Sequence, residues 1–386
     1  MSDKALHPQL TRFGSFALLA VASLTIMVGC VIVPGLPNIA RHLGAEESAS
    51  WLVTIPSLGV IVFGPMAGKL IDRIGLYKSL CLGLFVYGLL GIAGFLFQSP
   101  LVFVDRLFLG GATAMIMAAG TGLISEFYEG KARLKMIAKQ GMAIEFGGVI
   151  FLFMAGLLAN LGWQWPFTLY LLAWGLLAVV LVCVPQPSTA KYSSEPGEST
   201  LALSGALKVV FISAALSMIV FFTAIVVLPL RLHELDLDEA QVGYFLSYVS
   251  LVAVGAAAVM PSAARKLGEH GTLIFGFLFY VLGHLAFVNA DALTLMIEGG
   301  LCLGLGFGLT VPLLNHMTIE LSHTVRRGRN LAWLSVAIFA GQFFSSFMQF
   351  VPGAQTNGLI CATAVALFAA GMIVATAKRD RSRAAI

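Results

Sequence analysis

Apolar stretches of about 20 residues recur along almost the whole chain, separated by short polar segments. Each is long enough for a helix to cross a hydrocarbon core roughly 30 Å thick. They are too long, and too rich in Leu, Ala and Gly, for barrel strands of roughly 9 to 11 residues. Helices remain, because they satisfy all backbone polar groups within lipid. The twelve predicted spans are Phe13–Val33, Trp51–Leu70, Leu80–Phe97, Leu101–Ile124, Gly141–Leu161, Phe167–Val184, Val209–Leu230, Gly243–Ala264, Leu273–Val288, Leu293–Leu314, Leu331–Phe350 and Leu359–Ala377.

The longest polar interruption, Gln186–Thr200, lies at the middle of the chain and has the Ser, Pro, Gly and Glu composition of a flexible linker. The segments Gly68–Gly75 and Pro261–Gly268 align on either side of it, 193 residues apart (268 minus 75), which is half of the 386-residue length. We therefore predict an all-α membrane protein with twelve transmembrane helices in two pseudo-symmetric six-helix bundles, residues 1–185 and 207–386, joined by a cytoplasmic linker at 186–206.

The distribution of positive charge predicts the orientation, because Lys and Arg near span ends are retained in the cytoplasm. Of 23 Lys and Arg residues, 20 fall in the loops on the side of the N-terminus, whereas the opposite loops hold two, Arg41 and Arg231. The opposite loops collect acids instead: Glu46, Glu47, Glu234, Asp236, Asp238, Glu239 and Asp291. We expect both termini in the cytoplasm of a multi-pass protein of the cell membrane.

Composition narrows the function. The chain is 59% hydrophobic and only 11% charged, against roughly 25% charged in soluble domains. The net charge of +4 reflects the positive-inside bias, so nucleic acid is not an expected partner. All five cysteines fall within spans, and no hydrolase elbow, phosphate-cradling loop, metal spacing or redox pair occurs. We expect neither an enzyme nor a cofactor or metal site, and the soluble segments are too short for a nucleotide-binding domain.

Short motifs stand at defined places among the spans. The segment Gly68–Gly75, with Asp72 and Arg73, follows the second span, and further motifs are Pro34 with Pro37, Arg106 with Gly110, and the segment Gly162–Phe167. The first of these is similar to the signature of the major facilitator superfamily between its second and third helices, and the others are similar to patterns of its drug/proton antiporter branch. The resemblance covers essentially the full chain and implies the major facilitator fold, with alternating access by a rocker-switch motion around a site near the bilayer midplane.

The resemblance also implies cytoplasmic gating residues. Gly68 is expected to allow close helix packing, and Asp72 to cap the N-terminus of the eleventh helix, where the helix dipole favours an anion. Breaking these contacts is expected to shift the populations of inward and outward states. The residues assigned to gating are Gly68, Asp72, Arg73, Gly75, Glu126 and Arg133, with Arg327 as a further partner of Asp72.

Two departures from the family pattern bear on the mechanism. Leu76 and Tyr77 stand where the signature normally continues with two basic residues. In the fifth helix, where the antiporter pattern has Gly-Pro and then Gly-Gly, this chain has Phe151 and Leu152, and only Gly156 of the later glycine pair. The second departure weakens the implied proton antiport.

Four ionisable residues lie within the predicted spans: Asp105, Arg106, Glu145 and Glu298. Each costs at least about 2.5 to 3.5 kcal/mol near the bilayer centre, so each is a candidate for proton coupling. Glu145 is the first choice for carrying the proton, and Arg106 is expected to influence its ionisation. The alternative for Arg106 is a structural ion pair with Glu145 or Asp105. The alternative for Glu145 is an ion pair with Lys139. Asp105 and Glu298 have an alternative as outer-surface residues.

Aromatic and amide side chains in the second half could line an amphipathic substrate cavity. The candidates are Trp333, Gln342, His284, Tyr248 and Tyr244, with packing against neighbouring helices or facing lipid as the alternative for each. A lone histidine in a helix is more often a packed residue, so this alternative weighs most for His284.

Together these observations predict a secondary transporter, expected to be a monomer, whose partners are a small-molecule substrate, protons and the lipid bilayer. We expect export of a small amphipathic organic molecule, such as a drug, siderophore or metabolite, in exchange for protons. A proton-coupled symporter or facilitator for metabolite uptake is the alternative that the missing Gly-Pro favours. A membrane enzyme or receptor built on the same scaffold is a rival of another class.

Overall fold

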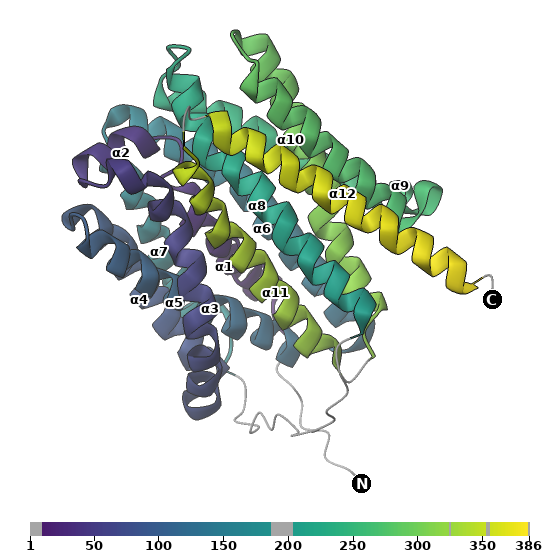
Figure 1. Cartoon of the computed structure of the whole chain (residues 1–386). Helices are drawn as coiled ribbons and strands as arrows, with labels where there is room; N and C mark the ends of the chain where they lie inside the picture. The colour runs from purple at the N-terminus through teal and green to yellow at the C-terminus, as the bar shows by residue number, and fades with distance from the viewer. Residues whose placement is uncertain (1–9, 187–203, 324–325, 353–355, 385–386) are drawn as a thin grey trace. The chain divides into compact units, whose positions relative to one another are not determined.

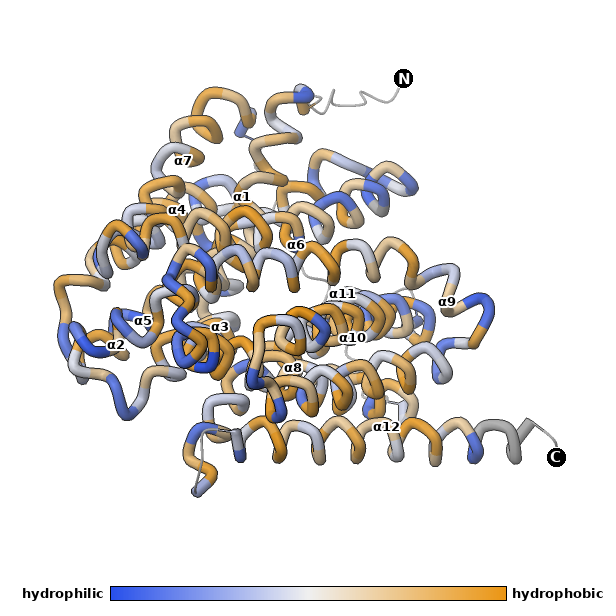
Figure 2. Tube along the Cα trace, turned by 90° about the horizontal axis from the view of Figure 1, so that it is seen from above, coloured by the Kyte–Doolittle hydropathy of each residue, from blue (hydrophilic) through white to orange (hydrophobic). Residues whose placement is uncertain are grey.

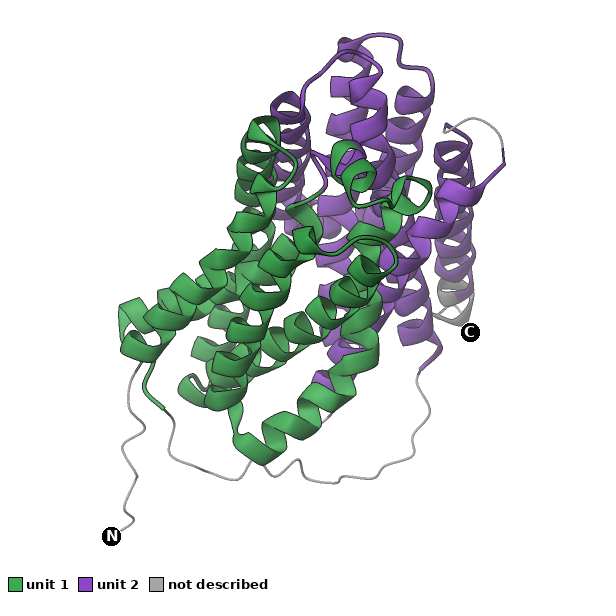
Figure 3. Cartoon of the chain, turned by 90° about the vertical axis from the view of Figure 1, so that its left-hand side faces the viewer, with its two compact units in different colours: residues 1–32, 38–199 green, residues 33–37, 200–386 purple. Residues whose placement is uncertain are grey.

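The computed structural model describes residues 10–186, 204–323, 326–352 and 356–384, and all regular secondary structure in these residues is helical (Figure 1). The chain divides into two compact units (Figure 3). Unit 1 comprises Met1–Ile32 and Asn38–Ser199, and unit 2 comprises Val33–Pro37 and Thr200–Ile386. Residues 187–203 of the predicted linker lie outside the described residues, so the predicted bundle boundaries stay a prediction.

Unit 1 consists of helices of 18 to 32 residues and shorter helical segments, most of them 3-10 turns. One of them, α2, begins in the segment assigned to unit 2 and ends in unit 1. In chain order the elements are α1 (Arg12–Cys30), α2 (Leu36–His42), η1 (Glu46–Ser48), α3 (Ala49–Ile74), α4 (Leu76–Ala93), η2 (Gly94–Leu96), α5 (Leu101–Phe127), α6 (Gly130–Leu161), η3 (Trp165–Leu171) and α7 (Leu172–Cys183).

Unit 2 has fewer but longer elements. They are α8 (Gly205–His233), α9 (Glu239–Val288), α10 (Leu293–Glu320), α11 (Arg327–Phe344), η5 (Ser345–Phe350) and α12 (Thr356–Ala384). Helix α9 begins with a capping box, in which Asp238 accepts from the Gln241 backbone amide at 2.8 Å and the Gln241 side chain accepts from the Asp238 amide at 2.9 Å. Such reciprocal bonds satisfy amide groups that a helix start otherwise leaves free.

The described helices agree with the predicted number of spans. Eleven of them are long and apolar enough to cross a membrane. One of these, α9, is 50 residues long and is broken at Gly268, so it holds two predicted spans and brings the total to twelve. Apolar residues run along the helices, and hydrophilic ones gather at their ends and turns (Figure 2).

The repeat predicted from the sequence has a counterpart in the backbone. Gly75, between α3 and α4, has φ 85° and ψ 161°. Gly268, its aligned partner, has φ 74° and ψ 165°. This region of backbone conformation is essentially accessible to glycine alone. The two halves therefore make the same sharp connection between consecutive spans at the aligned position.

The two cations predicted on the side opposite the termini are each paired locally. Arg41 Nε lies 3.2 Å from Glu46 Oε1. Arg231, in the last turn of α8, forms an ion pair with Glu234, the C-cap residue of that helix.

Close contact between α3 and α5 fixes the position of α5 in unit 1. A Cβ atom added to Gly110 would lie 2.0 Å from the Pro56 carbonyl oxygen, so only glycine permits the two backbones to approach this closely. Gly110 lies one turn after Arg106, and the contact therefore sets the height and rotation of that arginine within the unit.

Candidate functional site

A buried arginine lies at the centre of the polar side chains in unit 1. Arg106 on α5 has an exposed fraction of 0%. Its Nη1 donates a hydrogen bond of 2.9 Å to the Tyr170 hydroxyl on η3, which in turn donates to the Val28 carbonyl oxygen on α1 at 3.4 Å. The guanidinium group thus connects three elements of the unit through one phenol.

Aromatic rings surround this guanidinium group. Its carbon lies 5.1 Å from the centre of the Phe167 ring and 5.7 Å from that of Tyr170. A cation over an aromatic face is stabilised by about 0.5 to 2 kcal/mol, more when water is absent. Tyr87 on α4 extends the cluster, because its ring lies 5.5 Å from Tyr170 and its hydroxyl donates to the Leu24 carbonyl at 2.8 Å.

Asp105 is buried next to Arg106, with an exposed fraction of 5%. Consecutive helical residues point about 100° apart, so Asp105 and Arg106 leave α5 in different directions although both are buried. Asp105 lies against the η2 turn, where its Oδ2 would be 3.3 Å from a Cβ atom on Gly94, and Phe167 borders the same position. Its alternative as an outer-surface residue does not agree with this burial.

The polar atoms of this pair are largely unsatisfied within the described part of the chain. Both carboxyl oxygens of Asp105, and Nε and Nη2 of Arg106, are buried without a hydrogen-bond partner there. No carboxylate of a described residue lies within 4.0 Å of the guanidinium group. The predicted alternative of a structural ion pair with Glu145 or Asp105 is therefore not what the structure contains.

Glu145 lies near the middle of α6 and is half-buried. The neighbouring Gly147 packs against Ser23 of α1, and the carboxyl group is within electrostatic range of the Cys30 thiol. Among the described residues it has no ion pair, so the predicted alternative of a pair with Lys139 is absent there. Glu145 therefore remains a candidate for carrying a proton.

The candidates in unit 2 divide into exposed and buried residues. Glu298 on α10 is exposed, as are Trp333 and Tyr244, at 51% and 44%. Tyr248 is half-buried, and its hydroxyl donates to the Ile297 carbonyl at 3.3 Å. Gln342 on α11 is 7% exposed. Their assignment to a substrate cavity stays a prediction.

His284 is packed inside unit 2, which is the alternative that the sequence already favoured. Its exposed fraction is 0%. Nδ1 lies 2.8 Å from the Tyr280 carbonyl oxygen on α9, and Nε2 lies 3.1 Å from the Val220 carbonyl oxygen on α8. Both ring nitrogens thus face backbone acceptors of unit 2, and the ring has no exposed surface in this structure.

The gating candidates lie at the ends of α3, α5 and α6. Asp72, Arg73 and Arg133 are exposed, and Glu126 is half-buried. None of them has an ion pair within 4.0 Å among the described residues. A Cβ atom on Gly68 would meet open space, so close packing at this glycine is not seen here, whereas Gly75 has the glycine-only conformation described above. The gating role stays a prediction.

The sequence analysis missed the residues that hold Arg106. Tyr170, Tyr87 and Phe167 are all fully buried, and two of them carry hydroxyl groups within apolar spans. A search for polar side chains that repeat between the halves would have found Tyr87, because Tyr280 lies 193 residues later (280 minus 87). No comparable signal identifies Tyr170.

Comparison with known proteins gives a family for this arrangement. A family model described as Major Facilitator Superfamily matches residues 16–346. Multidrug resistance protein 1 of Bacillus subtilis is 27% identical over 156 residues, 39% of this chain and 39% of that protein. Puromycin resistance protein pur8 of Streptomyces alboniger is 29% identical over 178 residues, which are 44% of this chain and 34% of that protein. Quinolone resistance protein NorA of Staphylococcus aureus is 25% identical over 168 residues, which are 41% of this chain and 42% of that protein.

The chain thus spans less than half the length of the curated relatives it matches. Solved structures match over more of the chain. A mutant of the peptide transporter POT has a TM-score of 0.77 at 15% identity, covering 96% of both chains. A mutant of the nucleoside transporter NupG has a TM-score of 0.74 at 12% identity, covering 93% of this chain and 99% of the other. At such identities the likeness concerns the fold alone.

Proposed function

The chain belongs to the Major Facilitator Superfamily, and from this premise we propose that it exports a small amphipathic organic molecule from the cell in exchange for protons. It is a multi-pass membrane transporter and not an enzyme. In the proposed cycle, two bundles expose one binding site alternately to either side of the membrane. Both termini lie in the cytoplasm, as the distribution of Lys and Arg indicates.

The observation that carries the proposal is the buried Arg106 without a carboxylate partner among the described residues. Burying a charge that has no ion-pair partner is expensive, and within membranes such residues are retained where they act on ions or protons. In the proposed mechanism Asp105 or Glu145 carries the proton. Arg106 interacts electrostatically with the acid, so that the charge of the site changes between the two halves of the cycle.

Two observations support a cationic or zwitterionic drug-like molecule as the cargo. The relatives that match in sequence are named for resistance to several drugs, puromycin and quinolones. The apolar spans predicted from the sequence also hold three acids, Asp105, Glu145 and Glu298, against one base, Arg106. An excess of acids favours a cationic or zwitterionic cargo.

Proton-coupled uptake by symport is the second candidate. It is favoured by the sequence of α6, where Phe151 and Leu152 replace the Gly-Pro expected of antiporters. Both candidates use the same acids and the same alternating access, and they differ in the direction in which cargo moves relative to the proton.

An imposed pH gradient separates the two candidates. The purified chain in proteoliposomes would be given the fluorescent cation ethidium as probe, with the vesicle interior either acidic or alkaline. Antiport predicts that ethidium accumulates inside when the interior is acidic, because protons leaving the vesicle drive the probe inward. Accumulation with an alkaline interior would replace export by symport. The absence of gradient-driven movement for ethidium and a panel of neutral and zwitterionic drugs would overturn the proposal.

A set of matched acid variants tests the coupling residues. Glu145→Gln and Asp105→Asn each remove a candidate proton carrier, whereas Glu298→Gln removes an exposed acid of the same charge. Loss of the pH response in either of the first two, with ethidium binding retained in a thermal-shift assay at two pH values, supports the assignment. A pH response lost only in Glu298→Gln would transfer the role to unit 2.

A further inference from the structure

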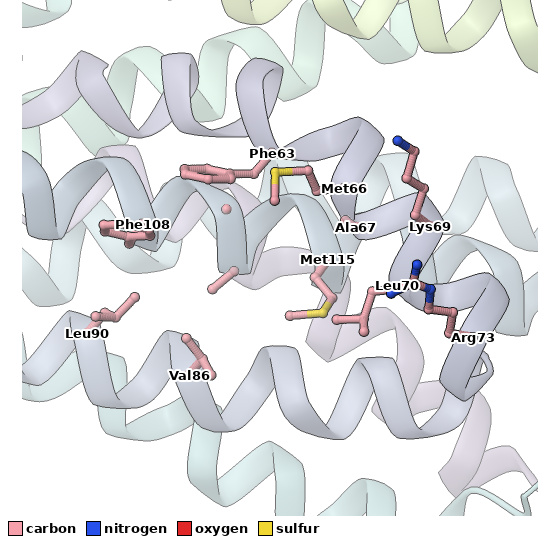
Figure 4. A pocket seen from close by; sticks show the side chains of 12 residues that line it. Phe63, Met66, Ala67, Lys69, Leu70, Arg73, Val86, Leu90, Phe108 and Met115 are labelled. Carbon is pink, nitrogen blue, oxygen red and sulfur yellow. The ribbon is translucent and has the colours of Figure 1, made fainter.

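Unit 1 contains an apolar groove between α3, α4 and α5 with a volume of about 670 Å³ (Figure 4). Helix α5 forms its floor with Phe108 and Met115. The walls are Phe63 and Met66 from α3 and Val86 and Leu90 from α4. Met66 is 59% exposed and Phe108 49% exposed, so the groove is open to the surroundings of the protein. In a membrane-spanning bundle such a surface faces lipid or a binding partner.

Positive charge is confined to one end of this groove. Lys69 and Arg73 lie there, on the last two turns of α3, while Phe108 and Leu90 lie at the other end (Figure 4). Both cations are exposed, and neither forms an ion pair with a carboxylate of the described residues. Asp72 lies between them in sequence but does not line the groove.

The length of the groove corresponds to one leaflet of a bilayer. From Phe63 to Arg73 the chain advances ten residues along α3, which is about 15 Å at 1.5 Å per residue. The hydrocarbon core of a bilayer is roughly 30 Å thick, so one leaflet contributes about half of that. The charged end coincides with the end of α3, and the ends of membrane-spanning helices are where headgroups are expected.

We propose that this groove binds one phospholipid with an anionic headgroup, whose acyl chain lies against Phe63, Val86 and Phe108 and whose phosphate contacts Lys69 and Arg73. Basic sites beside membrane helices attract such headgroups, and the guanidinium group offers paired donors to phosphate oxygens. The site is distinct from the Arg106 cluster, because Arg106 projects from the other face of α5, toward Tyr170. The inference goes beyond the proposed transport function and does not depend on it.

Other occupants agree less well with these features. A free phosphate would use the cations but leave the apolar walls unfilled. A neutral apolar molecule would fill the walls without using the cations. The combination of an apolar wall one leaflet long and two unpaired cations at its end is complementary to a molecule with one charged end and a long hydrocarbon chain.

Native mass spectrometry of the full chain measures this binding directly. The protein would be equilibrated in micelles with phosphatidylglycerol or with phosphatidylcholine of the same acyl chains, and the bound lipid counted. We expect one phosphatidylglycerol retained in preference to phosphatidylcholine. The double variant Lys69→Gln/Arg73→Gln should weaken its binding by about thirtyfold, as two membrane-surface cations contribute. The matched variant Lys131→Gln/Lys135→Gln removes two exposed cations of α6 and should change it less than twofold.

Filling the groove tests the acyl chain independently of charge. Val86→Trp should lower retention of phosphatidylglycerol while leaving both cations in place, and Leu90→Trp serves the same purpose if the first variant does not fold. Equal losses in the two double charge variants would overturn the proposal in favour of general surface attraction. So would unchanged binding in the filled groove, or phosphatidylcholine bound as firmly as phosphatidylglycerol by the unaltered chain.

Discussion

The two units place a tyrosine at the same position of their repeat and use it differently. Tyr87 on α4 and Tyr280 on α9 lie 193 residues apart (280 minus 87). Tyr87 donates to the Leu24 carbonyl on α1 at 2.8 Å. Tyr280 shares a hydrogen bond of 3.1 Å with the Ser217 hydroxyl on α8, and Leu24 and Ser217 are also 193 residues apart (217 minus 24). Each unit thus connects its third span to its first through an equivalent phenol.

The surroundings of these tyrosines differ in charge. In unit 2, Ser217, Tyr280 and Thr310 form a closed set of hydroxyl groups, with Ser217 Oγ 2.9 Å from Thr310 Oγ1 and Tyr280 Oη 3.3 Å from it. Thr310 also donates to the Gly306 carbonyl at 2.8 Å. In unit 1 the phenols border Arg106, a full charge with unsatisfied donors among the described residues.

A second pair of equivalent positions explains how unit 1 accommodates the arginine's partner. A Cβ atom on Gly91 would lie 2.2 Å from the Tyr170 ring, so the glycine provides the space for that ring. The equivalent residue in unit 2, 193 positions later (284 minus 91), is His284, which itself reaches the first helix of its unit. A neutral, hydrogen-bonded cluster stabilises packing, whereas burying a charge that has no ion-pair partner is costly. We therefore propose that the coupling role lies in unit 1 and that the equivalent polar positions of unit 2 serve packing.

Replacing the buried charge should give the largest effect. Arg106→Met is expected to reduce gradient-driven ethidium transport by at least about a hundredfold, equivalent to about 2.7 kcal/mol. The free energy of unfolding should stay the same or rise by about 1 kcal/mol, because removing a buried charge that has no ion-pair partner offsets the loss of its contacts with Tyr170 and Phe167. Transport in proteoliposomes and steric trapping in bicelles measure the two quantities.

Thr310→Val is the matched change in unit 2. It should lower the free energy of unfolding by about 1 kcal/mol, because it breaks the hydroxyl set, and should leave transport within about twofold. An Arg106→Met variant that unfolds, or a Thr310→Val variant that loses transport while remaining folded, would reverse the division of roles between the units.

The phenols themselves sharpen the comparison. Tyr170→Phe removes the hydrogen-bond acceptor of Arg106, and bonds to charged groups contribute about 1.5 to 3 kcal/mol. Tyr280→Phe leaves Ser217 and Thr310 bonded to each other, and its cost should be near the average of about 0.6 kcal/mol for hydrogen bonds between membrane helices. In the Arg106→Met background, Tyr170→Phe should lower the free energy of unfolding by only about 0.6 kcal/mol, as for Tyr280→Phe. A larger loss in that background would show that Tyr170 does not stabilise the protein through Arg106.

Much of the fold was predictable because hydrophobic length and charge asymmetry act on whole segments. Twelve apolar stretches became twelve spans once α9 was divided at Gly268, and Gly268 was already aligned with Gly75 in the sequence. The ends of the spans were less predictable. Helix α6, for example, begins at Gly130, whereas its apolar stretch begins at Gly141, because the exposed turns of a helix need not be apolar.

The site was predictable in its charges but not in its contacts. Arg106 and Asp105 stand out because ionisable residues are rare in spans, and both prove to be buried. Their neighbours depend on the three-dimensional path of the chain. Tyr170 reaches Arg106 from 64 residues away through a 3-10 turn, and no local pattern encodes that contact. His284 was ambiguous for the same reason, since only the position of α8 decides whether it faces a cavity or the Val220 carbonyl.

The aligned glycines test whether the two halves share one backbone design. Gly75→Ala and Gly268→Ala should each lower the free energy of unfolding by about 1 to 3 kcal/mol through backbone strain. Apart from the residues adjacent in the chain, no atom of the described residues lies within 4 Å of the added Cβ atom at either position, so a steric clash does not contribute. Gly64→Ala, in helix α3 and equally open, is the control and should be neutral or slightly stabilising. Losses that differ by more than about 1 kcal/mol would show that the connections are not equivalent.

The smallest expected effect concerns His284, which separates packing from cargo binding. Its ring nitrogens face carbonyl oxygens of α8 and α9, but a neutral imidazole has one N–H and donates to only one of them at a time. His284→Phe keeps a ring in place and should therefore lower the free energy of unfolding by only about 1 kcal/mol. The KM for ethidium should not change. Trp333→Ala truncates an exposed ring. If Trp333 contacts cargo, this variant should raise the KM for ethidium and leave the free energy of unfolding unchanged. A tenfold rise in KM for His284→Phe would mean that the histidine reaches cargo in another state of the transport cycle, and that unit 2 contributes more than packing.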